Sequence, residues 1–219
     1  LYGKTPVRLA VDSGLAAAGT IAAHCVHVDG EDIRMLSASR TAVVHCPVSN
    51  LNLACGIAPV SAMLAAGVGV SLGTDGPASG GTHDMFSTMR VAALAQKHLA
   101  GDPRALPAER ALWMATRGGA LALGLDDVGC IREGMKADII CVDTSGPHFH
   151  PALDPAACLV YCARPEDVRL VMVDGRVVKS NRKVLTLDEP SILSEVGARA
   201  RRIASGRWSP PGPGAPSIS

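Results

Sequence analysis

Three polar side chains stand at the ends of apolar segments, and their types suit metal or acid–base chemistry. His24 ends TIAAH, His45 ends TAVVH, and Asp75 follows VGVSLGT. Imidazole and carboxylate groups are common zinc ligands and common proton carriers in enzymes. A carboxylate at the end of an apolar strand is also costly to desolvate unless a cation or several donors meet it. The three residues are therefore candidates for one site.

Each candidate also has a structural alternative. Asp75 could cap a turn or a helix, and His24 and His45 could be rim or core histidines with hydrogen-bond partners. The residues after Asp75 are small, which we expect to leave room for a ligand near the backbone: Gly76, Ala78, Gly80 and Gly81. What favours a site is the same placement in all three segments, a polar side chain at the end of an apolar strand.

The segments that would position these residues alternate strand patterns with helical patterns. Alternation of this kind predicts βα units and a parallel sheet covered by helices. In a closed βα barrel, the carboxyl ends of all strands open onto one rim, so residues placed there converge. We expect strands at residues 20–26, 41–47 and 68–75, and helices at residues 5–15, 31–39 and 61–67.

The pattern changes after Gly124. Residues 84–101 and 107–124 predict two long helices, each closed by a glycine. Beyond them the chain is β-rich, and Asp174-Gly175 is a strong hairpin signal. The sequence therefore predicts an α/β part over residues 1–124, a separate β-rich part over residues 125–190, and a terminal helix with a disordered Pro/Gly-rich tail over residues 191–219. The β-rich segments are expected at residues 129–143, 157–163 and 168–184.

Composition narrows the function classes. The 219 residues are 47% hydrophobic and 19% charged with a net charge of +1, which is globular and offers no basic surface for nucleic acid or an anionic membrane. Seven scattered cysteines suit a reducing cytoplasm, and no apolar run is long enough to span a membrane. Leu1 reads as the middle of an element, so we also expect sequence upstream of it.

Several motifs in order resemble the amidohydrolase superfamily, in the branch that holds S-adenosylhomocysteine and methylthioadenosine deaminases, guanine deaminases and triazine hydrolases. The likeness covers about residues 2–189, and its motifs are AAHCVHVDGEDI, VVHCPVSNLNLACGIAPV, LGTDGPASGG, DMFSTMRVAALAQK, MATRGGALALGL, GCIREGMKADIICVD and VMVDGRVVKSNRKVLTLDE.

The resemblance implies the C-terminal part of a (β/α)8 TIM barrel, strands six to eight, with the returning segment of a small β-sandwich. Asp75 would ligate a single zinc, although iron or manganese can occupy such sites, and would transfer the proton of the attacking water. His24 would contact that water or the substrate. The resemblance places the remaining residues near a heterocyclic substrate: His45, Ser49, Asn50 and Gly76. It also implies a homodimer.

Two departures from the family matter. The family's H-x-H and H-x-x-E motifs cannot be mapped onto this chain, so we expect it to be inactive alone. Gly80 and Gly81 replace two Asn or Asp residues, which leaves substrate choice open. His148-Phe149-His150 has H-x-H spacing, but its position beyond the last barrel helix predicts a surface loop.

Two classes of function follow. The first is an enzyme that hydrolyses a carbon–nitrogen bond of a purine or related ring, with adenosine-type deamination as the leading candidate. Dechlorination or cyclic amide opening would use the same kind of site. The second is a non-catalytic product, either a truncated remnant or a subunit completed by another chain.

Overall fold

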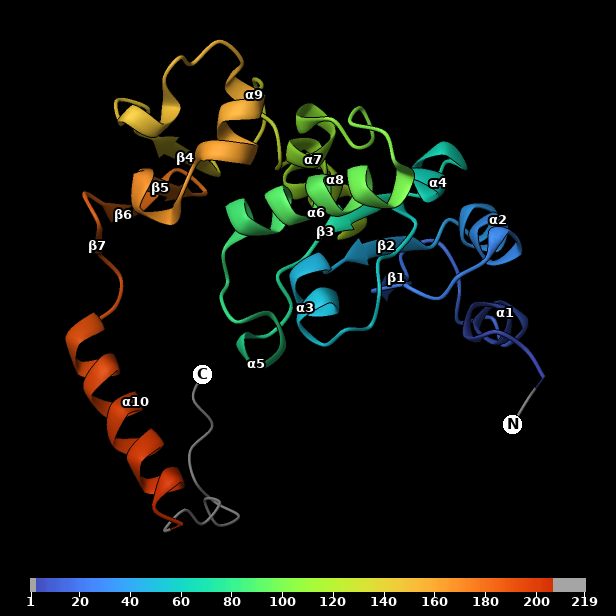
Figure 1. Cartoon of the computed structure of the whole chain (residues 1–219). Helices are drawn as coiled ribbons and strands as arrows, with labels where there is room; N and C mark the ends of the chain where they lie inside the picture. The colour runs from blue at the N-terminus through green and yellow to red at the C-terminus, as the bar shows by residue number, and fades with distance from the viewer. Residues whose placement is uncertain (1–2, 207–219) are drawn as a thin grey trace.

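Two sheets organise the chain, which this computed structural model describes over residues 3–206 (Figure 1). The first sheet is parallel and has the order β1 (Ile21–Ala23), β2 (Ala42–His45), β3 (Val70–Leu72). In its register, Val43 pairs with Ala22 on one side and with Val70 on the other. The three predicted strands are confirmed, but each is shorter than its apolar pattern because the chain turns away soon after the ladder.

Helices pack around this sheet. The helices α6 (Met85–Ala100), α7 (Ala108–Ala115) and α8 (Arg117–Ala122) contact β3, while α1 (Pro6–Asp12) and α2 (Gly30–Ser39) lie near β1 (Figure 1). Short helices follow the second and third strands: α3 (Pro47–Asn52), α4 (Val60–Ala65) and α5 (Pro77–Gly80). The core between sheet and helices is built from apolar side chains that are fully buried: Val43, Val60, Met63, Ala92, Ala93, Ala111 and Met114.

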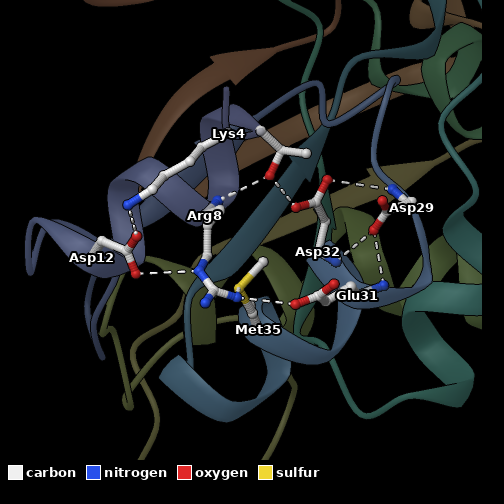
Figure 2. Close-up of polar contacts among 8 residues, drawn as sticks. Lys4, Arg8, Asp12, Asp29, Glu31, Asp32 and Met35 are labelled. Atoms are coloured by element: carbon white, nitrogen blue, oxygen red, sulfur yellow. Dashed lines mark hydrogen bonds and ion pairs between the residues drawn. The ribbon is translucent and has the colours of Figure 1, made fainter. Parts of the chain in front are cut away.

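A polar network joins the first two helices (Figure 2). Asp29 caps α2, and Asp32 in its first turn binds back to the Asp29 amide, which completes a capping box. The Thr5 hydroxyl caps α1 by accepting from the Arg8 amide and donates to the buried carboxylate of Asp32. One buried carboxylate therefore links the starts of both helices.

The predicted single helix over residues 107–124 is wrong, because the structure has two helices that meet at Thr116. Its backbone is at φ −121° and ψ −96°, outside the helical region. The break lays the Trp113 ring over Gly118, where an added Cβ would lie 2.7 Å from the ring atom Cζ3. This close packing accounts for the kink that helical periodicity alone did not show.

The second sheet is antiparallel, with the order β4 (Ile139–Val142), β5 (Val168–Val173), β6 (Arg176–Ser180), β7 (Lys183–Val184). The predicted hairpin is confirmed, since Val173 pairs with Arg176 across Asp174 and Gly175. Both turn residues have positive φ, 48° and 76°, as a two-residue type I′ turn requires.

One predicted β-rich segment is helical. Residues 157–163 fall in α9 (Pro155–Ala157) and the π-helix η2 (Cys158–Cys162), after the 3₁₀ turn η1 (Pro147–Phe149) and before a second, η3 (Pro165–Asp167). The carboxylate of Asp154 accepts from the amides of Ala156 and Ala157 and so starts the helix. Val160 is fully buried in the main core, because this segment packs against α6 and α7.

The predicted terminal helix is confirmed as α10 (Glu189–Ala204), which projects from the body and buries none of its residues (Figure 1). The predicted disordered tail lies outside the described residues except for Ser205 and Gly206. Within residues 3–206, no helix has the length and apolar character needed to cross a membrane.

Candidate functional site

The three polar residues singled out in the sequence lie at the same edge of the parallel sheet. His24 directly follows β1, His45 is the last residue of β2, and Asp75 comes three residues after β3. The His24 amide donates to the carbonyl of Val44 at 2.9 Å, and the Gly73 amide donates to the carbonyl of His45 at 3.0 Å. These bonds continue the ladder to the carboxyl ends of all three strands.

The backbone is strained at two of these strand ends. His24 has φ 67° and Asp75 has φ 59°, both in the left-handed region that few residues other than glycine adopt. Such a conformation costs on the order of 1–3 kcal/mol and is concentrated at functional sites. The strain turns both side chains away from the paths of their strands.

The carboxylate of Asp75 is held at both oxygens. Oδ2 accepts from the Ser49 hydroxyl at 2.6 Å, and Oδ1 accepts from the Gly76 amide at 2.7 Å. These bonds, then the Ser79 hydroxyl and the nearby imidazole of His24, lower the pKa of Asp75 to about 2. An exposed carboxylate whose charged form is favoured therefore stands at this edge.

The imidazole of His24 is held by Asn50, the residue of α3 that follows Ser49. Its Nδ1 lies 2.8 Å from Oδ1 of Asn50, and both residues are at least partly buried. Ser49 and Asn50 are consecutive, so adjacent residues of one short helix contact the ends of β1 and β3. The predicted site residues His24, Ser49, Asn50 and Asp75 are thus joined through hydrogen bonds and one peptide link.

The ring of His45 is enclosed instead of facing the site. It is completely buried, and neither ring nitrogen has a hydrogen-bond partner among the described residues. Side chains alternate along a strand, so His45 shares a face of β2 with the core residue Val43. Burial, and next the imidazole of His24, lower the pKa of His45 to about 4. The burial suits a supporting role for His45, and its contact with a substrate stays a prediction.

Small residues around Asp75 serve different purposes. A Cβ on Gly80 would lie 2.4 Å from the carbonyl oxygen of Thr74, so close packing of the loop requires glycine there. A Cβ on Gly76 or Gly81 would meet nothing within 4 Å. The expectation that all of these residues make room for a ligand is therefore wrong for Gly80, and it stays a prediction for Gly76 and Gly81.

Two residues near Asp75 carried no signal in the sequence. Ser79 contributes to the low pKa of Asp75 from the one-turn helix α5. Cys46 is buried beside the site, and burial followed by the charge of Asp75 raises the pKa of its thiol. Neither position has a spacing that would distinguish it from ordinary turn or strand residues.

Residues 3–206 gather no group of three or more His, Cys, Asp or Glu side chains that could hold a metal. The H-x-H sequence at residues 148–150 belongs to no such group either. Its first imidazole binds the carboxylate of Asp167 at 3.0 Å and packs on the ring of Phe149, which is buried. The predicted loop contains a 3₁₀ turn that is anchored to the protein through His148 and is followed by the exposed His150.

A cavity of about 330 Å³ lies elsewhere, between α1, β1 and α2. Its walls are mostly apolar and include Val7, Ala10 and Leu36, while His24, His45 and Asp75 do not line it. This cavity and the polar residues at the strand ends are therefore separate features of the molecule.

A parallel sheet with helices around it and polar side chains at its carboxyl edge is typical of the class of α/β proteins that build their sites at strand ends. Within that class, the chain belongs to the Amidohydrolase family, which it matches over residues 4–178. This membership confirms the resemblance seen in the sequence motifs.

Curated relatives in the family carry a deaminase name. The chain is 52% identical over 204 residues to a 5-methylthioadenosine/S-adenosylhomocysteine deaminase of Pelotomaculum thermopropionicum, covering 93% of this chain and 47% of the relative. A protein of the same name from Moorella thermoacetica is 47% identical over 202 residues, with 92% and 47% covered. The chain thus spans about half the length of the curated relatives it matches.

Solved structures extend the comparison. An adenosine deaminase from Xanthomonas campestris with bound zinc matches with a TM-score of 0.90 and 36% identity, covering 93% of this chain and 47% of that chain. An atrazine chlorohydrolase from Arthrobacter aurescens complexed with zinc matches with a TM-score of 0.83 and 34% identity, covering 90% and 44%. Both similar structures hold zinc.

Proposed function

We propose that this chain forms part of a zinc-dependent hydrolase that removes an amino group from a purine or related heterocycle, with adenosine-type nucleosides as substrates. The observation that carries the proposal is the ionised carboxylate of Asp75, linked through Ser49 and Asn50 to the imidazole of His24 at the carboxyl edge of a parallel sheet. The names of the deaminase relatives support this substrate class.

The residues present fit one part of a zinc site. Each Asp75 oxygen accepts one of the two hydrogen bonds described above, and a carboxylate oxygen has a second lone pair for a cation. Catalytic zinc needs about three protein ligands, and residues 3–206 do not gather three candidates. Asp75 is therefore proposed as one ligand, and we propose that the chain needs further ligands to hold zinc tightly and is inactive alone.

The chemistry of deamination assigns a task to each residue. Bound zinc would lower the pKa of a water molecule toward neutrality. The carboxylate of Asp75 would accept a proton from the attacking water and pass it to the departing amino group. A carbon–oxygen bond forms, the carbon–nitrogen bond breaks, and ammonia leaves. His24 would contact the attacking water or the ring carbon substituents, while Gly76 would border the substrate.

The residues around these two groups would have supporting tasks. His45 would hold the end of β2 from the buried side, and Ser49 and Asn50 would face the protein instead of the substrate. We propose the corresponding architecture as strands six to eight of a (β/α)8 barrel followed by a β-sandwich segment. This chain matches about half of each zinc-bound structure, which supports that assignment. A homodimer and a neutral heterocyclic substrate remain part of the proposal.

A second candidate is hydrolysis of a different ring substituent. The similarity to an atrazine chlorohydrolase favours it, because displacement of chloride by water would need the same proton acceptor. The two reactions differ in their products, ammonia or chloride. A non-catalytic subunit is the third candidate, supported by the incomplete ligand set.

A chimera tests these candidates. The part of the Pelotomaculum relative that this chain does not match would be fused to this chain, so that this chain takes the place of the relative's matching half. Zinc content is measured first, and then ammonia and chloride release from 5′-methylthioadenosine, adenosine and a chlorotriazine. The proposal expects a folded protein with about one zinc per chain that releases ammonia. A folded, zinc-loaded chimera that releases none would refute deamination.

A further inference from the structure

Two consecutive residues of α3 control two separate groups of the candidate site. Ser49 is completely buried and Asn50 is 3% exposed. Their polar atoms contact Asp75 and His24. We propose that Ser49 and Asn50 are positioning residues, and that Asn50 selects the tautomer of His24 in which Nδ1 carries the proton and Nε2 is free toward the site.

The tautomer follows from the atom that Asn50 presents. With the amide oriented as in the structure, Oδ1 of Asn50 lies 2.8 Å from Nδ1 of His24, and because an amide oxygen can only accept, this orientation places a proton on Nδ1. The other amide atom, Nδ2, is buried without a hydrogen-bond partner among residues 3–206. In neutral imidazole the other nitrogen is then an acceptor. Nε2 can accept a hydrogen bond from a water molecule, and this part of the inference rests on the proposed function. The other tautomer would present a donor there.

Ser49 controls orientation instead of protonation. A serine hydroxyl has a single proton, and Ser49 uses it on Oδ2 of Asp75. Oδ1 is held from the other side by the Gly76 amide at 2.7 Å. With both oxygens fixed, the Asp75 side chain cannot rotate about χ1 without breaking at least one bond. The left-handed backbone of Asp75 and these two bonds together define where its free lone pairs point.

Both contacts come from α3, and this gives the helix its proposed positioning role. Ser49 and Asn50 are adjacent, so their Cα atoms are about 3.8 Å apart, and a shift of the helix would move the partners of Asp75 and His24 together. The helix is itself packed against α6 and α5, and Ser49 and Asn50 are among its three buried residues. The separation between the carboxylate and the imidazole is therefore set by one rigid piece of backbone.

The test uses nuclear magnetic resonance on the 219-residue chain labelled with ¹⁵N-histidine, without metal. The His24 signals are assigned by their loss in His24→Gln. At a pH where His24 is neutral, the wild-type ring is expected to be protonated at Nδ1. Asn50→Ala should shift the tautomer ratio toward Nε2–H by about fivefold, the effect of one ordinary hydrogen bond. Asn50→Asp keeps an acceptor at the same place and should restore the Nδ1–H form.

The matched control is Asn52→Ala, on the same helix, since Asn52 donates to the carbonyl of Ser79 and does not contact His24. It should leave the tautomer unchanged. For Ser49, the couplings that report χ1 of Asp75 should show one rotamer in the wild type and averaging in Ser49→Ala. Ser49→Thr keeps the hydroxyl and should preserve the single rotamer.

Crossed readouts separate positioning from general damage to α3. Ser49→Ala should leave the His24 tautomer unchanged, and Asn50→Ala should leave the Asp75 rotamer unchanged, whereas loss of the helix would alter both. A wild-type His24 protonated at Nε2, or an averaged Asp75 in the wild type, overturns the inference. Failure of the ammonia assay with the expected tautomer and rotamer would count only against the proposed deamination.

Discussion

Ser49 Oγ lies 2.6 Å from Asp75 Oδ2, and this hydrogen bond is the largest single cause of the low pKa of Asp75. The bond joins α3 to the loop after β3, through two residues whose positions differ by 26. A donor aimed at a carboxylate favours the charged form. The hydrogen bond from Ser49 therefore favours the ionised form of Asp75 in the candidate site.

Ser49→Ala should raise the pKa of Asp75 from about 2 toward its usual value of 3.8. The reason is that the charged form loses its strongest donor while the Gly76 amide remains. The measurement is the ¹³C shift of the Asp75 carboxyl carbon as a function of pH. Ser79→Ala should raise this pKa less, because Ser79 contributes less than Ser49 and Gly76. An unchanged titration midpoint in Ser49→Ala would show that the bond is absent in solution.

Asp75→Asn should abolish most turnover in the chimera and spare the fold. Asparagine tolerates the left-handed backbone at φ 59°, but its amide cannot accept the proton of water. We expect kcat to fall by about 10²–10⁴-fold, the usual contribution of a proton-transferring group. The assay is ammonia release, with the melting temperature as the control for folding. Retained activity in a stable Asp75→Asn protein would disprove the assigned role.

Acid should destabilise the protein through His45. Its pKa is lowered to about 4 in the folded chain, against 6.5 when exposed, so the unfolded state binds more protons between these values. Stability from this residue is present above pH 6.5 and is lost as the pH falls toward 4, by on the order of 3 kcal/mol. Urea unfolding across this range measures the slope, which His45→Leu should flatten. His98→Gln, at an exposed helix position, should leave the slope as it is.

Thr5→Val should destabilise the junction of α1 and α2. Valine has nearly the same shape but no hydroxyl, so the buried carboxylate of Asp32 loses a donor and α1 loses its cap. The expected cost is about 1–3 kcal/mol in the free energy of unfolding by urea. Thr5→Ser retains the hydroxyl and should recover most of the stability.

The exposed ion pair between Lys4 and Asp12 provides a comparison for the Thr5→Val variant. Lys4 and Asp12 are 2.7 Å apart, with side-chain exposures of 48% and 35%. Surface pairs of this kind contribute about 0–1 kcal/mol, so Lys4→Ala should change stability less than Thr5→Val does. Equal losses in the two variants would contradict the view that the buried carboxylate dominates this junction.

The sequence predicted the elements with clear local signals. The hairpin at Asp174-Gly175 and the helix from Met85 to Ala100, with Asp84 as its cap and Gly101 in the left-handed conformation, are as expected. Failures came where packing overrode local pattern. Val160 is drawn into the main core as part of a π-helix, and Thr116 breaks a helix so that Trp113 can cover Gly118. Neither contact is visible from spacing.

The candidate site shows the same division. Parallel strands bring their carboxyl ends to one edge, so the common location of His24, His45 and Asp75 could be predicted from the strand pattern alone. The hydrogen-bond partners of these residues could not be predicted in this way. Which oxygen Ser49 binds, or that His45 is enclosed without a hydrogen-bond partner, depends on rotamers and on the path of α3 after Cys46. Sequence located the residues, and three-dimensional packing assigned their contacts.

The hairpin between β5 and β6 has a consequence for how the molecule assembles. Val173 and Arg176 meet after closing a loop of two residues, so this unit can form within about 1–10 μs. In the parallel sheet, Val43 meets Val70 only after an intervening stretch has collapsed and formed α3 and α4. In refolding from the unfolded chain, we therefore expect the antiparallel hairpin to become protected from hydrogen exchange before the parallel strands that hold the candidate catalytic groups.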